Sequence, residues 1–196
     1  MSHPEGEPEG TPTHQPVGAG PSEVDVEIVR VGIEAVDEFE PLWLQLRAHH
    51  SSLEPHMRQQ APNVSWGLRR DEYLAWLTLP GSFAVTARKA GRLVGYAVVV
   101  VHQGPDDTWV TGDRIAEVES LCVAVGERGG GLGSALLDFV DWELAAVGIR
   151  DVQIGVVAAN SSAIRFYERR GLRPRLTIMS RFPAADVDSD RYRDTP

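Results

Sequence analysis

The sequence has very few of the residues that build disulfide frameworks or lysine-containing phosphate loops. Cys122 is its only cysteine and Lys89 its only lysine. One cysteine excludes an intramolecular disulfide and argues against a thiolate-rich metal site. A Walker A loop needs a lysine next to a glycine-rich turn, and Lys89, in a predicted strand, does not supply it. There is no H-E-x-x-H motif, and His49, His50 and His56 lack a regular ligand spacing, so we predict no metal site.

Long hydrophobic runs are also missing. The longest, residues 96–101, is far shorter than the roughly 20 residues that cross a bilayer. No basic segment followed by an apolar one opens the chain, as a secretory leader would. Apolar residues make up 42% and charged residues 24% of the chain, which is an ordinary globular composition. We therefore expect a soluble, cytoplasmic protein without a membrane partner.

Positive charge is in short supply. The 28 acidic residues outnumber the 19 lysines and arginines, and the net charge is −9. An acidic surface repels phosphate backbones, so we predict no nucleic-acid partner. Cationic small molecules or basic peptides match this charge better, although the charge also serves solubility alone in many proteins.

The composition divides the chain into three parts. Residues 1–22 are rich in Pro, Gly, Glu and Thr and nearly devoid of large apolar side chains. Such a segment cannot offset its ordering entropy by burial, so we predict a disordered tail. Residues 23–184 are long enough for one domain with its own core, and residues 185–196 form an acidic, flexible C-terminal tail.

Hydrophobic periodicity predicts a mixed α/β fold. Alternating or compact apolar runs indicate strands, and apolar residues spaced three and four apart indicate helices. Gly91 can supply the tight turn of a hairpin between two of the strands. The expected strands span 24–30, 82–88, 93–102, 115–125, 152–157 and 177–182, and the expected helices span 39–50, 69–79, 132–147 and 161–170.

A glycine-rich segment, Arg128-Gly129-Gly130-Gly131-Leu132-Gly133-Ser134, joins a predicted strand to a predicted helix. The N–H groups at the start of a helix attract anions, and residues without a Cβ let a phosphate reach the main chain. The spacing does not match the dinucleotide fingerprint G-x-G-x-x-G or the nucleophile elbow G-x-S-x-G. The segment therefore favours a phosphate site of another kind.

A second segment, residues 160–172, predicts a capped helix. Ala163, Phe166 and Tyr167 share one helix face. Asn160 or one of the two serines after it can cap the helix start. The two aromatic residues are either core residues or, for Tyr167, a hydroxyl at the lip of a cleft.

Together the two segments resemble the GNAT superfamily of acyl-CoA-dependent N-acyltransferases. The family's pyrophosphate loop, [RQ]-x-x-G-x-[GA], matches residues 128–133. Its second motif, N-x-x-A-x-x-F-Y-x-x-x-G-F, matches from Asn160 to Gly171, with Leu172 in place of the last Phe. The proline and aromatic residue that often precede the loop are absent, where this chain has Val125 and Glu127. The resemblance covers about residues 24–182.

This resemblance implies the GNAT fold: a mixed, mostly antiparallel sheet of six to seven strands, flanked by about four helices. It places acetyl-CoA in a split between the fourth and fifth strands. It also implies that the main chain of one strand pairs with the pantetheine arm, that the loop holds the pyrophosphate, and that Asn160 contacts the arm. The implied cofactor-binding residues are Leu121, Cys122, Val123, Arg128, Gly129, Gly130, Gly131, Leu132, Gly133, Ser134, Asn160, Ala163 and Phe166.

The resemblance also suggests catalytic residues. Glu119 lies two residues before Leu121, where many family members keep a base, and Glu117 is the reserve candidate. A carboxylate is a weak base for an amine, so it would act through ordered water or with a raised pKa. Otherwise both glutamates are surface carboxylates. Tyr167 matches the family's general acid, and Cys122 as an acyl-enzyme nucleophile is a weaker rival.

We therefore expect an N-acetyltransferase that transfers an acetyl group from acetyl-CoA to a primary amine by direct attack in a ternary complex. The acidic charge favours a cationic small molecule as the acceptor. One alternative is a protein or peptide N-acetyltransferase acting on an N-terminus or lysine. Another is a non-catalytic acyl-CoA-binding regulatory module. The resemblance is also compatible with a homodimer.

Overall fold

The structure is a computed structural model that describes residues 26–180. The tails predicted at residues 1–22 and 185–196 lie outside the described residues. Among the described residues, no helix is both long and apolar enough to span a membrane.

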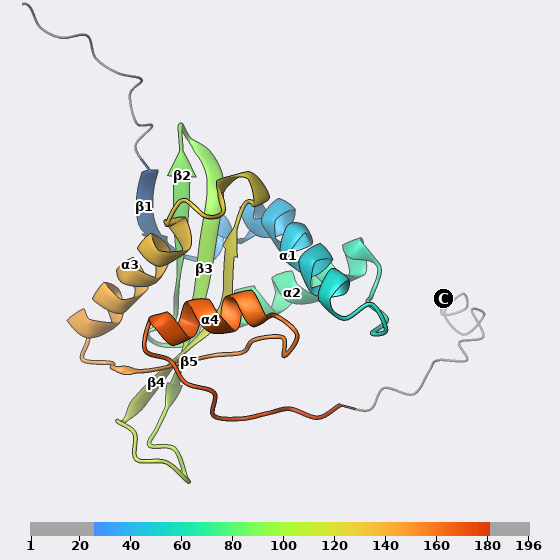
Figure 1. Ribbon diagram of the computed structural model, residues 1–196. Helices are drawn as coiled ribbons and strands as arrows, with labels where there is room; N and C mark the ends of the chain where they lie inside the picture. Colours follow the sequence, from blue (N-terminus) through green and yellow to red (C-terminus); the bar gives the residue numbers. More distant parts are fainter. Residues whose placement is uncertain (1–25, 181–196) are drawn as a thin grey trace, which may run out of the picture.

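A five-stranded mixed sheet in the order β1-β2-β3-β4-β5 forms the centre of the fold (Figure 1). The first four strands pair in an antiparallel manner, and β5 joins β4 in parallel. The strands are β1 (Val26–Val31), β2 (Phe83–Lys89), β3 (Arg92–Gln103), β4 (Arg114–Val123) and β5 (Asp151–Ile154). The predicted fold class is confirmed, although the described residues form five strands rather than the six to seven expected.

Four α-helices flank the sheet: α1 (Glu40–Leu53), α2 (Pro62–Trp76), α3 (Leu132–Ala146) and α4 (Ser161–Arg169). Two short 3₁₀-helices, η1 (Ile33–Phe39) and η2 (Val125–Glu127), precede α1 and α3. Helix α2 begins at Pro62 rather than near residue 69, because a proline is well suited to the first turn of a helix. It therefore covers part of a region that we expected to be a loop.

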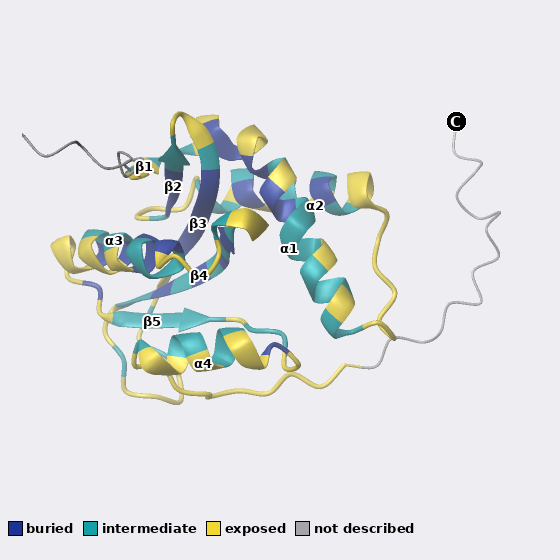
Figure 2. Ribbon diagram, turned by 45° about the horizontal axis from the view of Figure 1, so that its top comes forward, coloured by how far each residue is buried: buried dark blue, intermediate teal, exposed yellow. Residues whose placement is uncertain are grey.

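The sheet separates two hydrophobic clusters, and β3 between them is buried along most of its length (Figure 2). On one side, Leu136 and Val140 of α3 pack with Val99 and Val118, and Phe166 and Tyr167 of α4 pack against this cluster. On the other side, the aromatic residues of η1, α1 and α2 pack against β3 and β4. They are Phe39, Trp43, Trp66 and Tyr73.

The last strand predicted from the sequence is not present in the described part of the chain. Residues 172–180 have no strand or helix, and residues 181 and 182 lie outside the described range. Arg175 holds this segment through its side chain, which donates to Gln153 and Asp106 at 3.2 Å each. Side-chain contacts thus take the place of a backbone ladder, and β5 is the edge of the sheet.

Candidate active site

Strands β4 and β5 are paired only at one end. Their parallel register runs from Ile115 opposite Asp151 to Val118 opposite Ile154. Strand β4 continues to Val123, whereas β5 ends at Ile154. The part of β4 after Val118 therefore has a free edge, and a sheet edge of this kind can pair with an extended ligand. The family resemblance implied a split at this place, between the fourth and fifth strands.

Glu119 is the extra residue of a β-bulge at the start of this free edge. Val98 of β3 pairs with Ser120, and the next residue, Val99, pairs with Val118, so Glu119 has no partner on β3. A bulge bends a strand and changes the direction of side chains around it. Accordingly, Val118 belongs to the cluster under α3, whereas Cys122 belongs to the cluster under α1 and α2.

The register also determines where the main-chain groups of β4 point. The N–H of Ala124 donates to the carbonyl of Val94 at 2.8 Å, and Tyr96 pairs with Cys122 two residues along. Hydrogen-bonded and non-hydrogen-bonded pairs alternate in an antiparallel ladder. The main chain of Cys122 is therefore directed towards β3, and that of Leu121 and Val123 is directed towards the split. Of the three residues predicted to pair with pantetheine, two lie on the free edge.

The glycine-rich loop leads from β4 to the start of α3. Gly129 and Gly131 have φ values of +83° and +85°, which only glycine adopts readily. Gly131 is the N-cap of α3, and no side chain caps the helix. Within the described chain, no hydrogen bond takes the N–H groups of Leu132, Gly133 or Ser134. These donors and the helix dipole can attract an anion, and the binding of a phosphate there stays a prediction.

Arg128 and Gly133 connect this loop with the split. The Nε of Arg128 donates to the Val123 carbonyl at 3.1 Å, so its guanidinium lies at the end of the free edge. Gly133 faces α4, because a Cβ there would lie 3.7 Å from Phe166 and 3.8 Å from Val123. The predicted loop residues and Phe166 are thus brought to one place.

Asn160 is buried at 8% exposure and caps α4. Its Oδ1 accepts hydrogen bonds from the Ala163 N–H at 3.1 Å and from the Ser162 hydroxyl at 2.9 Å. The predicted N-cap is therefore confirmed at Asn160. Its contact with a cofactor stays a prediction, and Oδ1 is already used for the cap.

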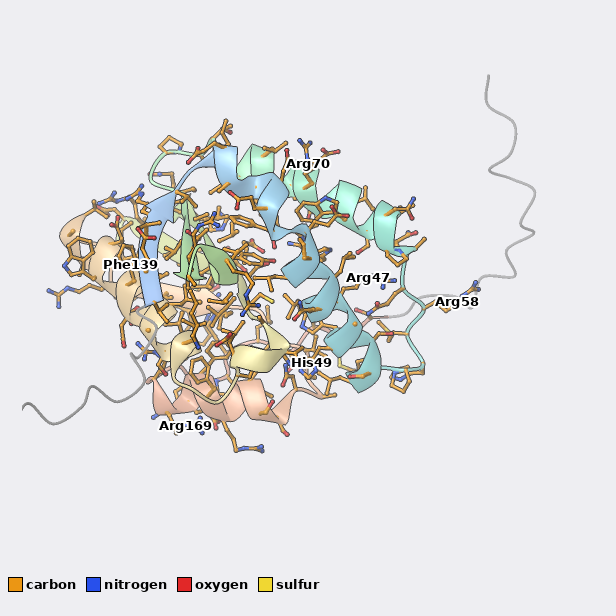
Figure 3. The ribbon with its side chains drawn as sticks, turned by 90° about the horizontal axis from the view of Figure 1, so that it is seen from above. Arg47, His49, Arg58, Arg70, Phe139 and Arg169 are labelled. Atoms are coloured by element: carbon orange, nitrogen blue, oxygen red, sulfur yellow. The ribbon has the colours of Figure 1, made fainter. Side chains whose placement is uncertain are left out.

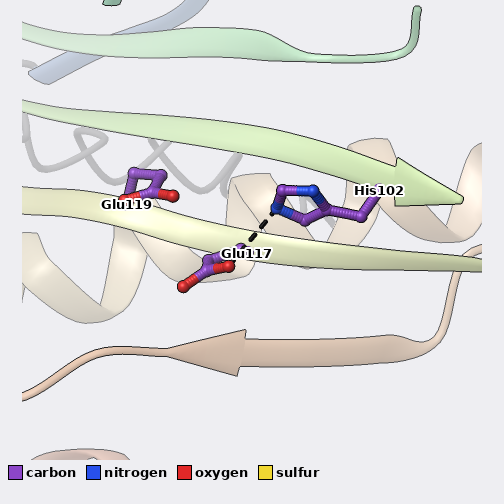
Figure 4. Close-up of side chains that lie close together, drawn as sticks. All are labelled: His102, Glu117 and Glu119. Atoms are coloured by element: carbon purple, nitrogen blue, oxygen red, sulfur yellow. Dashed lines mark ion pairs between the residues drawn. The ribbon is translucent and has the colours of Figure 1, made fainter. Parts of the chain in front are cut away.

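A cluster of one histidine and two glutamates lies on β3 and β4 (Figure 4). The Nε2 of His102 lies 3.3 Å from Oε2 of Glu117, and one potential ligand atom from each of His102, Glu117 and Glu119 lies within 4.8 Å of the others. The sequence analysis missed His102, because its position beside Glu117 depends on the pairing of β3 with β4. The donor set is of a kind that can hold a cation, which the prediction of no metal site did not consider.

The two glutamates differ in their partners. Glu117 accepts a hydrogen bond from Gln153 at 3.0 Å and is paired with His102. Glu119 has no hydrogen bond or ion pair with another described residue. Burial raises the pKa of Glu119, and the negative charge of Glu117 raises it further. A raised pKa makes a carboxylate a better base, so the geometry favours Glu119 over Glu117 for that role.

Tyr167 lies half-buried on α4, with its ring packed edge-on against Phe166 at a centroid distance of 5.1 Å. Burial raises the pKa of Tyr167 to about 12. Its hydroxyl has no hydrogen-bond partner among the described residues. The ring packs against the core, as one interpretation expected, and the position of the hydroxyl at the lip of a cleft stays a prediction.

Cys122 is poorly suited to nucleophilic catalysis. Its thiol is buried and donates to the Leu42 carbonyl at 3.1 Å. Burial raises the pKa of Cys122 to about 12. Since the thiolate is the reactive form, this environment suppresses its reactivity at neutral pH.

The free edge of β4 beyond its fourth parallel pair thus lies beside a glycine-rich loop and a helix start without a side-chain cap. Residues 43–172 match the Acetyltransferase (GNAT) family, and the chain belongs to this family of acyltransferases.

Similar proteins carry related names. The chain is 31% identical over 126 residues to a mycothiol acetyltransferase of Amycolatopsis mediterranei, a match that spans 64% of this chain but only 40% of that protein. It is 33% identical over 110 residues to an uncharacterized N-acetyltransferase of Mycobacterium tuberculosis, a match that spans 56% of this chain and 65% of that protein.

Among solved structures, an aminoglycoside N-acetyltransferase in complex with CoA superimposes with a TM-score of 0.63. The match covers 84% of this chain and 99% of that one. The identity is 14%, so this likeness concerns the fold alone.

Proposed function

We propose that the protein transfers an acetyl group from acetyl-CoA to a primary amine of a small molecule, by direct attack of the amine in a ternary complex. The observation that carries the proposal is the free edge of β4 after Val118, which faces a split beside the glycine-rich loop. The family match supports the same reaction. A cytoplasmic location belongs to the proposal as well.

The cosubstrate would lie along the split. The main chain of Leu121 and Val123 would pair with the amides of the pantetheine arm, as a strand pairs with a sheet edge. The N–H groups of residues 129–134 and the guanidinium of Arg128 would bind the pyrophosphate. The Val123 N–H is the donor best placed to polarise the thioester carbonyl.

The amine arrives as an ammonium ion and must lose a proton before it attacks. An alkylamine has a pKa of about 10, and an ordinary glutamate one of about 4.3, so direct transfer is unfavourable by roughly six units. The raised pKa of Glu119 makes the difference between its pKa and that of the amine smaller. Glu119 would therefore take the proton through an ordered water, while its negative charge attracts the cation.

The departing thiolate needs a proton or a hydrogen bond. A thiol has a pKa of about 8.5, well below the pKa of about 12 of Tyr167. Complete proton transfer from the phenol is therefore uphill. Tyr167 would instead donate a hydrogen bond to the developing thiolate, and the second proton, which the nitrogen releases after its attack on the thioester, would complete the thiol.

The acceptor is proposed to be a cationic small molecule. The carboxylates of Glu117 and Glu119 on the α2 side of the sheet and the acidic chain support a cation. The names of the relatives, a mycothiol acetyltransferase and an aminoglycoside N-acetyltransferase, support a small molecule.

The test is the release of CoA thiol from acetyl-CoA across a panel of amines and short peptides, with an amine-free control. Selective release with one class of small amine supports the proposal, and release only with peptides would replace it by a peptide acetyltransferase. Binding of acetyl-CoA in calorimetry without release by any amine would favour a non-catalytic acyl-CoA-binding module.

A further inference from the structure

A second hollow lies away from the split, between α1 and the segment that leads into α2. Its volume is about 210 Å³, and its lining side chains are Trp43, Arg47, His50, Gln59, Gln60 and Ser65. None of these side chains is acidic, and each carries at least one N–H or O–H donor, counting one N–H of the neutral imidazole. We call this hollow the α1–α2 pocket.

Two donors of the α1–α2 pocket lack an acceptor. Nε1 of Trp43 and Nε of Arg47 are both buried and have no hydrogen-bond partner in the described chain. Trp43 itself is only 9% exposed. A buried donor without an acceptor costs about 1–3 kcal/mol. Both atoms are closed off from solvent, so an acceptor from outside the chain reaches them only when the side chains shift.

The charge of the pocket indicates what kind of acceptor fits. Arg47 extends from α1 towards the α2 side, where its Nη2 donates to the main-chain carbonyl of Gln60 (Figure 3). This carbonyl is neutral and leaves the positive charge of Arg47 uncompensated. No carboxylate in the described chain pairs with Arg47. A guanidinium without a carboxylate partner on a pocket lined by donors favours an anion as the ligand.

Arg69 links this pocket to the candidate active site. Its guanidinium lies 4.6 Å from the ring centroid of Trp43. Burial is the largest cause of both pKa shifts, lowering the pKa of His50 and raising that of Glu119, and the charge of Arg69 is a smaller cause that acts downwards on both. In His50, burial is the largest cause of the lowered pKa, so its imidazole is neutral at pH 7. Arg69 of α2 is thus a common neighbour of the pocket and of the bulge.

We propose that the α1–α2 pocket binds an anionic group, a carboxylate or a phosphate, of the same small molecule whose amine is acetylated beside Glu119. The acceptor class is then an amine that also carries an anion, as amino acids and aminoalkyl phosphates do. This inference rests on the proposed acetyl transfer. The positive pocket and the negative bulge together select such a molecule in one orientation.

The first experiment measures binding without turnover. The indole N–H signal of Trp43 is assigned by nuclear magnetic resonance with Trp43→Phe, and the protein is titrated with acetate, inorganic phosphate and neutral acetamide at constant ionic strength. We expect the Trp43 signal to move with at least one anion and not with acetamide. The anion that moves it at lower concentration identifies the group. Equal shifts with acetamide, or no shift with either anion, would overturn the proposal.

Arg47→Gln should abolish this response, and Arg47→Lys, which keeps the charge without the planar donors, should retain part of it. Arg150→Gln is the control, because Arg150 is exposed just before β5 and does not line the pocket. An unchanged response in Arg47→Gln would overturn the assignment of Arg47.

The second experiment measures kcat/KM for matched acceptors: ω-amino acids against their amides, and aminoalkyl phosphates against the corresponding amino alcohols. We expect kcat/KM to be at least tenfold higher for the anionic member of one pair. This ratio should fall towards 1 in Arg47→Gln and should persist in Arg150→Gln. Acetylation without this preference would overturn the inference and leave the proposed function intact. An anion response at Trp43 without acetylation of any amine would contradict the proposed function and, with it, the role of the pocket in acceptor binding.

Discussion

Tyr73 of α2 donates a hydrogen bond of 2.6 Å to the hydroxyl of Ser120, the residue that directly follows Glu119 on β4. Both residues are buried, and the Tyr73 hydroxyl also lies 3.2 Å from that of Tyr96. Burial raises the pKa of Tyr73, so its hydroxyl is a neutral donor. This bond fixes α2, which carries Arg69, against the β-bulge that carries the proposed base.

Tyr73→Phe should destabilise the protein by about 1–3 kcal/mol, because it leaves the buried hydroxyls of Ser120 and Tyr96 with one partner fewer. It should also lower kcat, since Glu119 loses its anchored neighbour. Urea unfolding and CoA release measure the two effects. Tyr96→Phe is the control, because it removes only the 3.2 Å contact and keeps the bond to Ser120. Equal losses in the two variants would contradict the importance of that bond.

Glu119→Gln should reduce kcat by about 10²–10⁴-fold, the usual contribution of a general base. The wild-type rate should fall at acidic pH with an apparent pKa above the ordinary value for glutamate, because the pKa of Glu119 is raised. Glu117→Gln should move this limb to lower pH, since the charge of Glu117 is one cause of the shift. If Glu117→Gln no longer showed the fall in rate at acidic pH, and Glu119→Gln remained active, the base would be Glu117.

The same substitution should stabilise the fold at neutral pH. Because the pKa of Glu119 is raised in the folded protein, folding favours its protonated form, and the ionised form destabilises the fold. Glu119→Gln removes this cost, so its Tm at pH 7 should exceed that of the wild type by a few degrees. The difference should shrink as the pH falls through the raised pKa of the folded state and should vanish below about 4.3, the unfolded pKa, where Glu119 is protonated in both states. A lower Tm at pH 7 would contradict the burial of an unpaired carboxylate.

The glycine loop and the cap of α4 could be predicted from the sequence because both depend on local signals. A left-handed residue at the start of a helix needs a glycine, as at Gly131, and an Asn before a helix is a strong N-cap, as at Asn160. The β2–β3 hairpin was predictable for the same reason, since Gly91 has a φ of +76°.

The bulge at Glu119 and the neighbour His102 could not be predicted in this way. Both follow from the register between β3 and β4, which depends on residues far apart in the sequence. Strict alternation would have given Glu119 a partner on β3. The α1–α2 pocket could not be predicted either. The second helix was expected to begin near residue 69, so Ser65 lay outside it.

Tyr167→Phe should lower kcat by about 10²-fold, the order seen when one preorganised donor to a developing charge is removed. The affinity for acetyl-CoA and the Tm should stay close to those of the wild type, because the hydroxyl bonds to no other described residue and the ring remains packed on Phe166. Single-turnover kinetics and calorimetry check the two parts. Unchanged turnover would exclude a role for the phenol in thiolate departure.

Gly131→Ala should weaken the binding of acetyl-CoA. The φ of +85° at Gly131 costs a residue with a Cβ about 1–2 kcal/mol, although no atom would crowd the new methyl group. The loop would relax in the free protein and would have to regain this conformation on binding, which corresponds to about a 5–30-fold rise in Kd. Gly126→Ala is the matched control, because Gly126 precedes the loop, has no positive φ and has equally open surroundings. Calorimetric titration with acetyl-CoA measures both variants, and an equal Kd in the two would mean that the left-handed residue at the start of α3 does not shape the anion site.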